Sequence, residues 1–357
     1  GAGPPGAQRG ARAARGGDVG LAPLAAPPLA QAMSAGVVER LDARSVTAEE
    51  WAARLDGRAP VLLAGALETA GPWDPRAWEA QLFEQHGGKL TSYTTRGRCG
   101  SFRAYAPLAR VRAAVAASSH ALPVSCMDEG LLEGEPLRAV LSRVPAFMRQ
   151  DYFQEEAFRR HVRVSPACFC LGGRGTRSDF HADYFDWTGW NVLLRGKKVW
   201  RWWRRTPANE AALAGFRVPR LTEVHPEGVA AGWETSADSF AEVLPLGGAP
   251  SGASGAGGAL PNFAPRASPD GGPVPTPDFE AVQLPGDMVV FPGHWWHQVY
   301  HLDETVAVAS QYCNDRVLHR CLRHALEWCG VEAGDAEALL RGLAARGAPG
   351  PRRVDEA

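Results

Sequence analysis

The sequence predicts a mainly β (α+β) fold, a double-stranded β-helix of the jelly-roll or cupin type with helices before and after it. Two observations carry this prediction. Short apolar runs separated by turn residues recur through the chain, without the regular strand–helix alternation that builds a parallel sheet. Apolar residues at helical spacing lie mostly towards the two ends. A chain of 357 residues with 45% hydrophobic residues can also bury a substantial core.

The first segment, residues 1–35, differs in composition from the rest of the chain. It contains mainly Gly, Ala, Pro and Arg, with Asp18 as its one acidic residue. Such a segment cannot bury enough apolar surface to offset the entropy lost on ordering, so we expect a disordered, low-complexity N-terminus. An arginine-bearing, acid-poor start is also compatible with a transit peptide, and that alternative stays open.

Helix-start signals open the predicted domain. Thr47 and Glu50 can cap each other's free backbone amides, and Asp74 followed by Pro75 is typical of a second helix start. The turn at Gly97–Gly100 predicts a hairpin. The elements expected in this part are a helix from Thr47 through Leu55, a strand at Pro60–Ala64, a helix from Asp74, strands at Leu90–Tyr93 and Ser101–Tyr105, and a helix at Leu108–Ala117.

The middle of the chain is predicted to supply most strands of the jelly roll, including a hairpin that turns at Arg195-Gly196. Residues 247–277 are rich in Gly, Pro, Ala and Ser, which predicts a flexible surface insertion. After Asn314 apolar residues recur at helical spacing, and a second helix is expected to end near Arg346. The expected strands are Val162–Leu171, Trp190–Leu194, Lys198–Trp203, Gln283–Phe291, Trp296–Tyr300 and Val306–Tyr312.

Composition argues against several classes of protein. The formal net charge of −1 gives no reason to expect a nucleic-acid partner. No run of 18 apolar residues occurs, so no membrane-spanning segment is expected. The 7 cysteines include no Cys-x-x-Cys pair, which favours reduced thiols and a cytoplasmic or nuclear protein.

The most informative pattern is a histidine and a carboxylate two residues apart, followed by a distant histidine. His181 and Asp183 share one side of an extended segment, because alternate residues of a strand point the same way. His297, which closes the run Phe291-Pro-Gly-His-Trp-Trp-His, can complete a facial triad on one metal ion. His294 lies in the same run but does not share that face. A chance surface His-x-Asp pair and a core histidine at 297 are the alternatives that spacing alone leaves open.

These motifs resemble those of the Jumonji C (JmjC) family of iron(II)- and 2-oxoglutarate-dependent oxygenases. The chain is most similar to the small hydroxylase-type members, with an arginine demethylase/lysyl hydroxylase-like core, over about residues 38–328. The resemblance is most specific in residues 176–204 and 282–314. It implies that iron(II) is the metal, that 2-oxoglutarate is the cosubstrate and that dioxygen is consumed. The implied iron ligands, which are also the implied catalytic residues, are His181, Asp183 and His297.

The same resemblance implies a buried cation for the far carboxylate of 2-oxoglutarate, a role that suits lysine or arginine. It assigns this role to Lys198, after the Gly196 turn, in preference to the neighbouring Lys197. A further hydroxyl is expected on the strand after His297, where counting places Ala309, with a serine next to it. The residues expected to bind the cosubstrate are Lys198, Asn191, Ser178 and Ser310.

By this resemblance we expect a JmjC oxygenase domain at residues 36–330 and a C-terminal helix and tail at residues 331–357. The expected activity is hydroxylation of a side chain of a protein or peptide substrate. The alternative within the family is an N-methyl-lysine or N-methyl-arginine (histone) demethylase. The resemblance implies that the C-terminal helices form a homodimer or shape the substrate entrance, and the alternative is that they pack on their own domain. Residues that could line the substrate pocket are Tyr152, Asp186, Trp187 and Trp233.

Two further classes of function remain open. One is a catalytically silent JmjC module that acts by binding, and the other is a different cupin metalloenzyme that does not use 2-oxoglutarate. Lys198 beside Asn191 argues against the second class, because only a dicarboxylate cosubstrate needs that buried cation.

Overall fold

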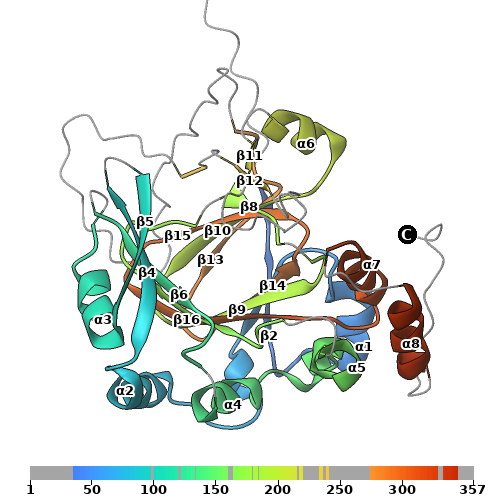
Figure 1. Cartoon of the computed structure of the whole chain (residues 1–357), viewed down its shortest axis with the longest axis horizontal. Coiled ribbons are helices and arrows are strands. Elements are labelled where there is room, and N and C mark those ends of the chain that lie inside the picture. The colour runs from blue at the N-terminus through green and yellow to red at the C-terminus, as the bar shows by residue number, and fades with distance from the viewer. Residues whose placement is uncertain are drawn as a thin grey trace, which may run out of the picture. The chain divides into compact units, whose positions relative to one another are not determined.

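The computed structural model contains two facing β-sheets with helices packed around them (Figure 1). Most neighbouring strands pair antiparallel. This confirms the prediction of a mainly β, jelly-roll fold. The structure describes residues 35–97, 100–119, 122–132, 134–159, 164–178, 180–183, 185–214, 217–219, 233–235, 239–240, 274–328 and 333–344.

Within the described residues, the smaller sheet has seven strands, with β10 and β15 near its centre. These two strands pair antiparallel, which sets Lys198 opposite His301 and Trp202 opposite His297. The order along the sheet is β1 (Gly36–Val37), β13 (Phe279–Gln283), β10 (Lys198–Trp203), β15 (Trp296–His301), β8 (Phe180–His181), β12 (Trp233–Thr235) and β11 (Arg217–Pro219).

The larger sheet has nine strands in the part of the chain that the structure describes. Its centre is buried on both faces, and its far edge is the predicted hairpin of β4 and β5, which is confirmed. The order along the sheet is β2 (Glu39–Asp42), β3 (Val61–Ala64), β14 (Met288–Pro292), β9 (Thr188–Arg195), β16 (Thr305–Tyr312), β7 (Cys168–Gly172), β6 (Val124–Asp128), β4 (Leu90–Gly97) and β5 (Gly100–Pro107).

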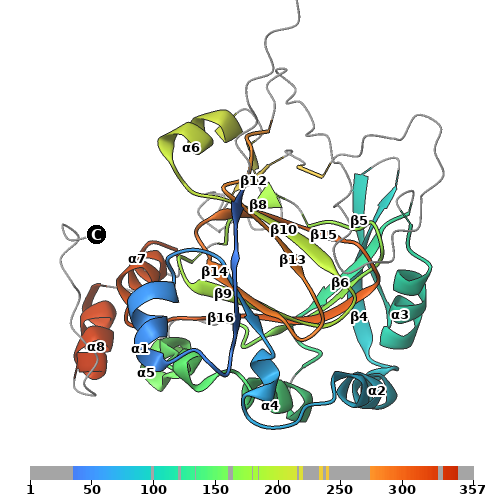
Figure 2. The same ribbon diagram turned by 180° about the vertical axis from the view of Figure 1, so that it is seen from behind.

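Helices pack along the outside of the two sheets. Figures 1 and 2, seen from opposite sides, place α2 (Pro75–His86), α3 (Leu108–Ala116) and α4 (Glu135–Leu141) around the larger sheet. Both views group the remaining helices other than α6 (Pro207–Ala214) at the opposite flank. That group comprises α1 (Ala48–Glu50), α5 (Glu156–Arg159), α7 (Leu318–Trp328) and α8 (Ala333–Ala344).

The predicted helix starts are confirmed. Thr47 Oγ1 accepts a hydrogen bond from the Glu50 backbone N–H at 3.1 Å, and a π-helical turn, Trp51–Leu55, continues α1. At the start of α2, Asp74 accepts from the backbone amides of the first turn. These caps satisfy amides that have no partner inside the helix.

Two predictions of connectivity are wrong. The expected hairpin around Gly196 is a crossover, since β9 belongs to the larger sheet and β10 to the smaller one. The expected single strand Gln283–Phe291 is likewise two strands, β13 and β14, in different sheets. Both turns contain a glycine with positive φ, 85° at Gly196 and 87° at Gly286. A hairpin turn carries the same signal, so the local sequence does not distinguish the two connections.

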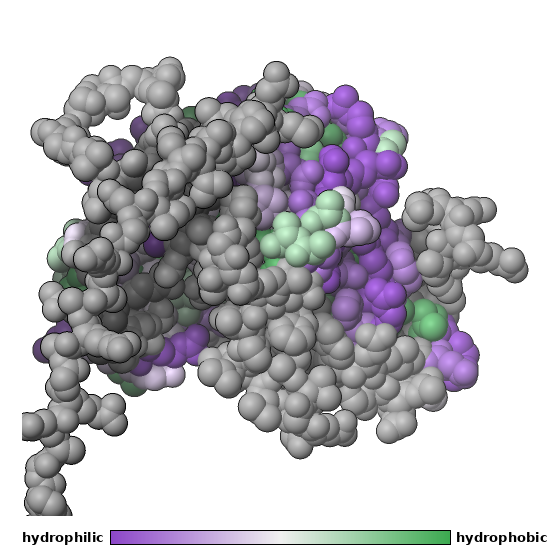
Figure 3. All heavy atoms as spheres, turned by 90° about the horizontal axis from the view of Figure 1, so that it is seen from above, coloured by the Kyte–Doolittle hydropathy of each residue, from purple (hydrophilic) through white to green (hydrophobic). Residues whose placement is uncertain are grey.

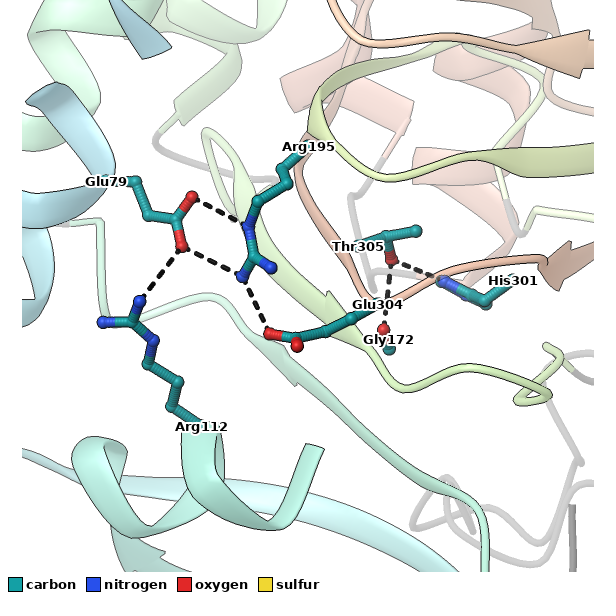
Figure 4. Close-up of polar contacts among 7 residues, drawn as sticks. All are labelled: Glu79, Arg112, Gly172, Arg195, His301, Glu304 and Thr305. Atoms are coloured by element: carbon teal, nitrogen blue, oxygen red, sulfur yellow. Dashed lines mark hydrogen bonds and ion pairs between the residues drawn. The ribbon is translucent and has the colours of Figure 1, made fainter. Parts of the chain in front are cut away.

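A network of charged side chains ties α2 and α3 to the end of β9 (Figure 4). Arg195 donates to both oxygens of Glu79 on α2, at 3.1 and 3.0 Å, and to Glu304 at 2.8 Å. Arg112 on α3 approaches Glu79 at 3.7 Å. Because the Glu79 side chain is only 8% exposed, these partners compensate a carboxylate withdrawn from water.

The low-complexity segment lies outside the described residues, except for Ala35, and so does most of the expected insertion at 247–277. The last part of that insertion is packed: Val274 is buried beside Phe180 and Trp203, and Trp203 donates to the Pro275 carbonyl at 2.8 Å. Among the residues described, none of the helices is long and apolar enough to span a membrane. Seen from above, the described surface is largely hydrophilic, with a small apolar patch (Figure 3).

Candidate metal centre

Three of the predicted site residues meet on the smaller sheet. His181 ends β8 and is paired directly with His297 on β15, which sets their rings 4.3 Å apart. Asp183 follows two residues later and lies 3.9 Å from His181 Nε2 and 4.0 Å from His297 Nε2, measured from its Oδ1. One ligand atom from each of the three residues lies within 4.8 Å of the others. The fold therefore brings together a group that could hold one metal ion.

Hydrogen bonding fixes the form of His297 that a metal requires. Its Nδ1 is 3.0 Å from the backbone carbonyl of Trp295. A carbonyl only accepts, so Nδ1 carries the proton and Nε2 keeps its lone pair for a ligand. Burial, together with the nearby His181, lowers the pKa of His297 to about 4. The imidazole is consequently neutral near pH 7, as metal binding needs.

Asp183 is held by two further contacts. Its Oδ2 accepts a hydrogen bond from Trp187 Nε1 at 3.0 Å, which leaves Oδ1 directed towards the two imidazoles. Its backbone N–H donates to the carbonyl of Gly293 at 2.9 Å. One oxygen is thus engaged by the protein and the other is available to an ion.

Aromatic side chains wall the centre. Phe291 and Trp200 lie 4.8 and 6.3 Å from the ring of His297, and both are buried between the sheets. Two imidazole nitrogens and one carboxylate oxygen on one side, with apolar walls around them, form the donor set that suits iron(II) with open coordination positions. The residues present therefore fit the metal that the sequence analysis expected.

A buried cation lies on β10, the strand that pairs with β15. The side chains of Lys198, Trp200 and Trp202 point between the sheets, because they alternate along β10, and His297 lies opposite Trp202. Lys198 is 2% exposed, and its Nζ is 3.3 Å from Asn191 Oδ1 across the interior. Burial lowers the pKa of Lys198 to about 8. No carboxylate among the described residues pairs with Lys198, so this ammonium group suits an anionic ligand.

Comparison with known proteins agrees with this geometry. No family model matches the chain. The chain is 27% identical over 172 residues to the 2-oxoglutarate and iron-dependent oxygenase JMJD4 of Mus musculus. The aligned region covers 48% of this chain and 31% of that protein. The chain is similar to proteins of the JmjC oxygenase type.

Two demethylases of Arabidopsis thaliana are also similar to this chain. The lysine-specific demethylase JMJ21 is 24% identical over 288 residues, or 78% of this chain and 26% of that protein. The arginine-specific demethylase JMJ20 is 23% identical over 168 residues, or 46% of this chain and 28% of that protein. The aligned part spans 26–31% of the length of these relatives.

The two hydroxyl groups expected to bind the cosubstrate beside Lys198 form hydrogen bonds with backbone groups instead. Ser178 Oγ accepts from the Val299 backbone N–H at 3.0 Å, so it supports β15. Ser310 does not approach Lys198: its hydroxyl donates to the Pro166 carbonyl at 2.6 Å on the other face of β16, and Ala309 faces the interior. The choice of Lys198 over Lys197 is supported, because Lys197 is exposed.

A further histidine, not expected from the sequence, lies in the same interior. His301 is paired with Lys198 across β10 and β15, and its Nδ1 lies 2.6 Å from Thr305 Oγ1 (Figure 4). Burial and the neighbouring Lys198 lower the pKa of His301 well below its usual range. Its position four residues after His297, on the same strand face, is the signal that could have identified it.

The four residues suggested for the substrate pocket lie in different surroundings. Tyr152 is buried against α7 and contacts Asp315, so it belongs to a packing cluster. Asp186 lies 3.3 Å from His324 Nε2 on α7. Trp187 donates a hydrogen bond to Asp183, one of the three candidate metal ligands. The side chain of Trp233 lies outside the described part of the chain.

Proposed function

We propose that this chain is an iron(II)- and 2-oxoglutarate-dependent dioxygenase that hydroxylates a side chain of a protein substrate. The observation that carries the proposal is the joint presence, between the same two sheets, of the His181–Asp183–His297 group and the buried Lys198, which pairs with no carboxylate of the described residues. A metal group alone would suit many cupins, whereas the buried cation suits a dicarboxylate. The name of the JMJD4 relative supports the same reading.

In this proposal each residue has a defined task. His181, Asp183 and His297 hold iron(II), which with 2-oxoglutarate and dioxygen supplies oxidation of an unactivated C–H bond. Lys198 binds the far carboxylate of 2-oxoglutarate, and Asn191 orients the ammonium group by accepting one of its hydrogen bonds. The apolar walls around His297 exclude water from the reaction space.

N-methyl demethylation is the second candidate, because two relatives are named lysine-specific and arginine-specific demethylases. Both reactions start with hydroxylation of a carbon atom, so they would use the same metal group. They are distinguished by the product, since a methyl group is lost as formaldehyde only in demethylation. Incubation with protein extracts, followed by mass spectrometry and formaldehyde detection, separates the two.

The direct test is anaerobic titration of the iron(II)-loaded protein with 2-oxoglutarate, which develops a visible absorption band when the oxo acid chelates iron. We expect the band in the native protein, its loss in Asp183→Ala, and a much higher 2-oxoglutarate requirement in Lys198→Ala. Lys197→Ala is the matched control, because that neighbouring lysine is exposed and should not affect the titration. Iron binding without the band would contradict the cosubstrate assignment, and failure to bind iron would favour the silent binding module.

A further inference from the structure

Trp187 folds back onto Asp183, the candidate metal ligand that precedes it in the chain. Trp187 lies four residues beyond Asp183, and its indole Nε1 donates to Asp183 Oδ2 at 3.0 Å. The other oxygen, Oδ1, is the one that lies near both imidazoles. A single indole N–H therefore distinguishes the two oxygens of the carboxylate: it binds one and leaves the other for the metal.

The indole itself is held on several sides. Phe185 stacks on it with ring centroids 5.5 Å apart and planes 10° apart, and Phe153 meets it edge-on at 6.0 Å. Phe185 and Trp187 also pack against an apolar cluster that contains Val317 and, from α7, Leu318, Cys321 and Leu322. A side chain clamped in this way has little freedom to rotate away from Asp183.

Gly293 connects the indole to the ligand backbone. Its N–H donates to the Trp187 carbonyl at 2.9 Å, and its own carbonyl accepts from the Asp183 N–H at 2.9 Å. A Cβ at position 293 would lie 2.7 Å from Trp187 Cδ1 and 2.7 Å from its carbonyl oxygen. Glycine is therefore needed here for close approach, and the ligand and the indole form one rigid unit with the turn before β15.

We propose that Trp187 is a positioning residue of the metal centre: it holds Asp183 as a ligand that offers one oxygen, and it links that ligand to the packing of α7. The inference rests on the proposed metal site. Groups that orient metal ligands typically contribute tenfold to a hundredfold to metal affinity. Loss of the indole N–H should accordingly weaken metal binding by about tenfold or more.

The experiment measures cobalt(II) affinity and the cobalt(II) absorption spectrum, so it does not depend on turnover. Trp187→Phe removes the N–H and part of the ring, and replacement of Trp187 by 3-benzothienylalanine removes the N–H while preserving the ring shape. The matched control is Trp78→Phe, because Trp78 is also buried and donates its N–H to a backbone carbonyl, of Pro136, away from the metal group. Apo-protein thermal unfolding shows that each variant is folded at the temperature of measurement.

We expect both Trp187 variants to lose about tenfold or more in cobalt(II) affinity and to change the cobalt(II) spectrum, while Trp78→Phe changes neither. Native affinity and an unaltered spectrum in the 3-benzothienylalanine protein would overturn the inference. Asp183→Ala distinguishes failure of the proposed metal site from failure of the positioning role of Trp187. If it binds cobalt(II) as tightly as the native protein, the proposed metal site fails; if it loses binding while the Trp187 variants keep theirs, only the positioning role fails.

Discussion

Lys198 is the residue whose chemistry is most sensitive to its surroundings. Its pKa is lowered from 10.5 to about 8 because it is buried without a carboxylate partner among the described residues. An anionic ligand stabilises the charged form and raises the pKa again. Without an anionic ligand, the Lys198 side chain is therefore charged below about pH 8 and neutral above it.

The first prediction is that 2-oxoglutarate affinity depends on pH in one direction. Below about pH 8 the affinity should be constant, and above it the affinity should fall by up to about tenfold per pH unit, since binding then requires uptake of a proton. Calorimetric titration of the manganese(II)-loaded protein between pH 6.5 and 9.5 measures this.

The matched control for this titration is Lys198→Arg. A guanidinium group keeps its charge throughout the range, so the variant should show a weaker but pH-independent affinity. A flat profile in the native protein would contradict the role of Lys198.

At the scale of residues, the sequence was sufficient wherever strand alternation decides the geometry. His181 and Asp183 could be placed together because i and i+2 share a face, whereas the role of Lys198 came from the family resemblance; the structure brings the three to the same interior. Trp187 was suggested only as a pocket residue, because its contact with Asp183 depends on how a loop folds back. Ser310 was chosen for its hydroxyl, but parity turns it to the opposite face of β16 from Ala309.

At the scale of elements, close approach between the two sheets depends on Gly172 of β7. A Cβ at this position would lie 2.0 Å from the Nδ1 atom of His301, whose ring is anchored on Thr305 (Figure 4). The ring therefore rests directly on the β7 backbone. Any larger residue must displace it and break its hydrogen bond.

The second prediction is that Gly172→Ala lowers the free energy of unfolding by about 2 kcal/mol or more, through overpacking and loss of the His301–Thr305 bond. Urea unfolding at pH 7 measures the change. Gly88→Ala is the control, because no atom lies within 4 Å of a Cβ built there. Equal stability of the two variants would show that the interior adapts without cost.

The elements themselves were predicted better than their connections. Capping residues defined the helix starts because a cap is a local interaction between neighbouring residues. The turns at Gly196 and Gly286 were read as a hairpin and as strand interior, although both carry the chain from one sheet to the other. That distinction depends on which distant strands are neighbours, β15 for β10 and β16 for β9, and no local pattern contains it.

At the scale of the whole molecule, the metal group joins segments that are more than a hundred residues apart. His181 and His297 come from β8 and β15, so an ion bound between them cross-links the smaller sheet. A ligand that binds only the folded state stabilises it according to its concentration relative to its dissociation constant.

The third prediction is that manganese(II) and 2-oxoglutarate at about a hundred times their dissociation constants each raise stability by about 2.7 kcal/mol. For a domain of this size the thermal midpoint should rise by about 4 °C with each ligand. Differential scanning fluorimetry tests this, with Asp183→Ala as the control that should not respond to the metal. A thermal unfolding midpoint of the native protein that neither ligand raises would contradict the proposed site.

The hydrogen bonds of Asp56 also have a consequence for how this chain is made. Its carboxylate accepts from Tyr312 Oη at 2.7 Å and from Asn314 at 2.6 Å, and β3 pairs with β14, so the first strands find their partners near the last ones. A ribosome adding roughly 5–20 residues per second needs roughly 10–50 seconds to cover the 256 residues between Asp56 and Tyr312. For most of that interval β14 has not been synthesised, so the edge of β3 that pairs with it is unpaired, and unpaired strand edges are the surfaces that chaperones shield.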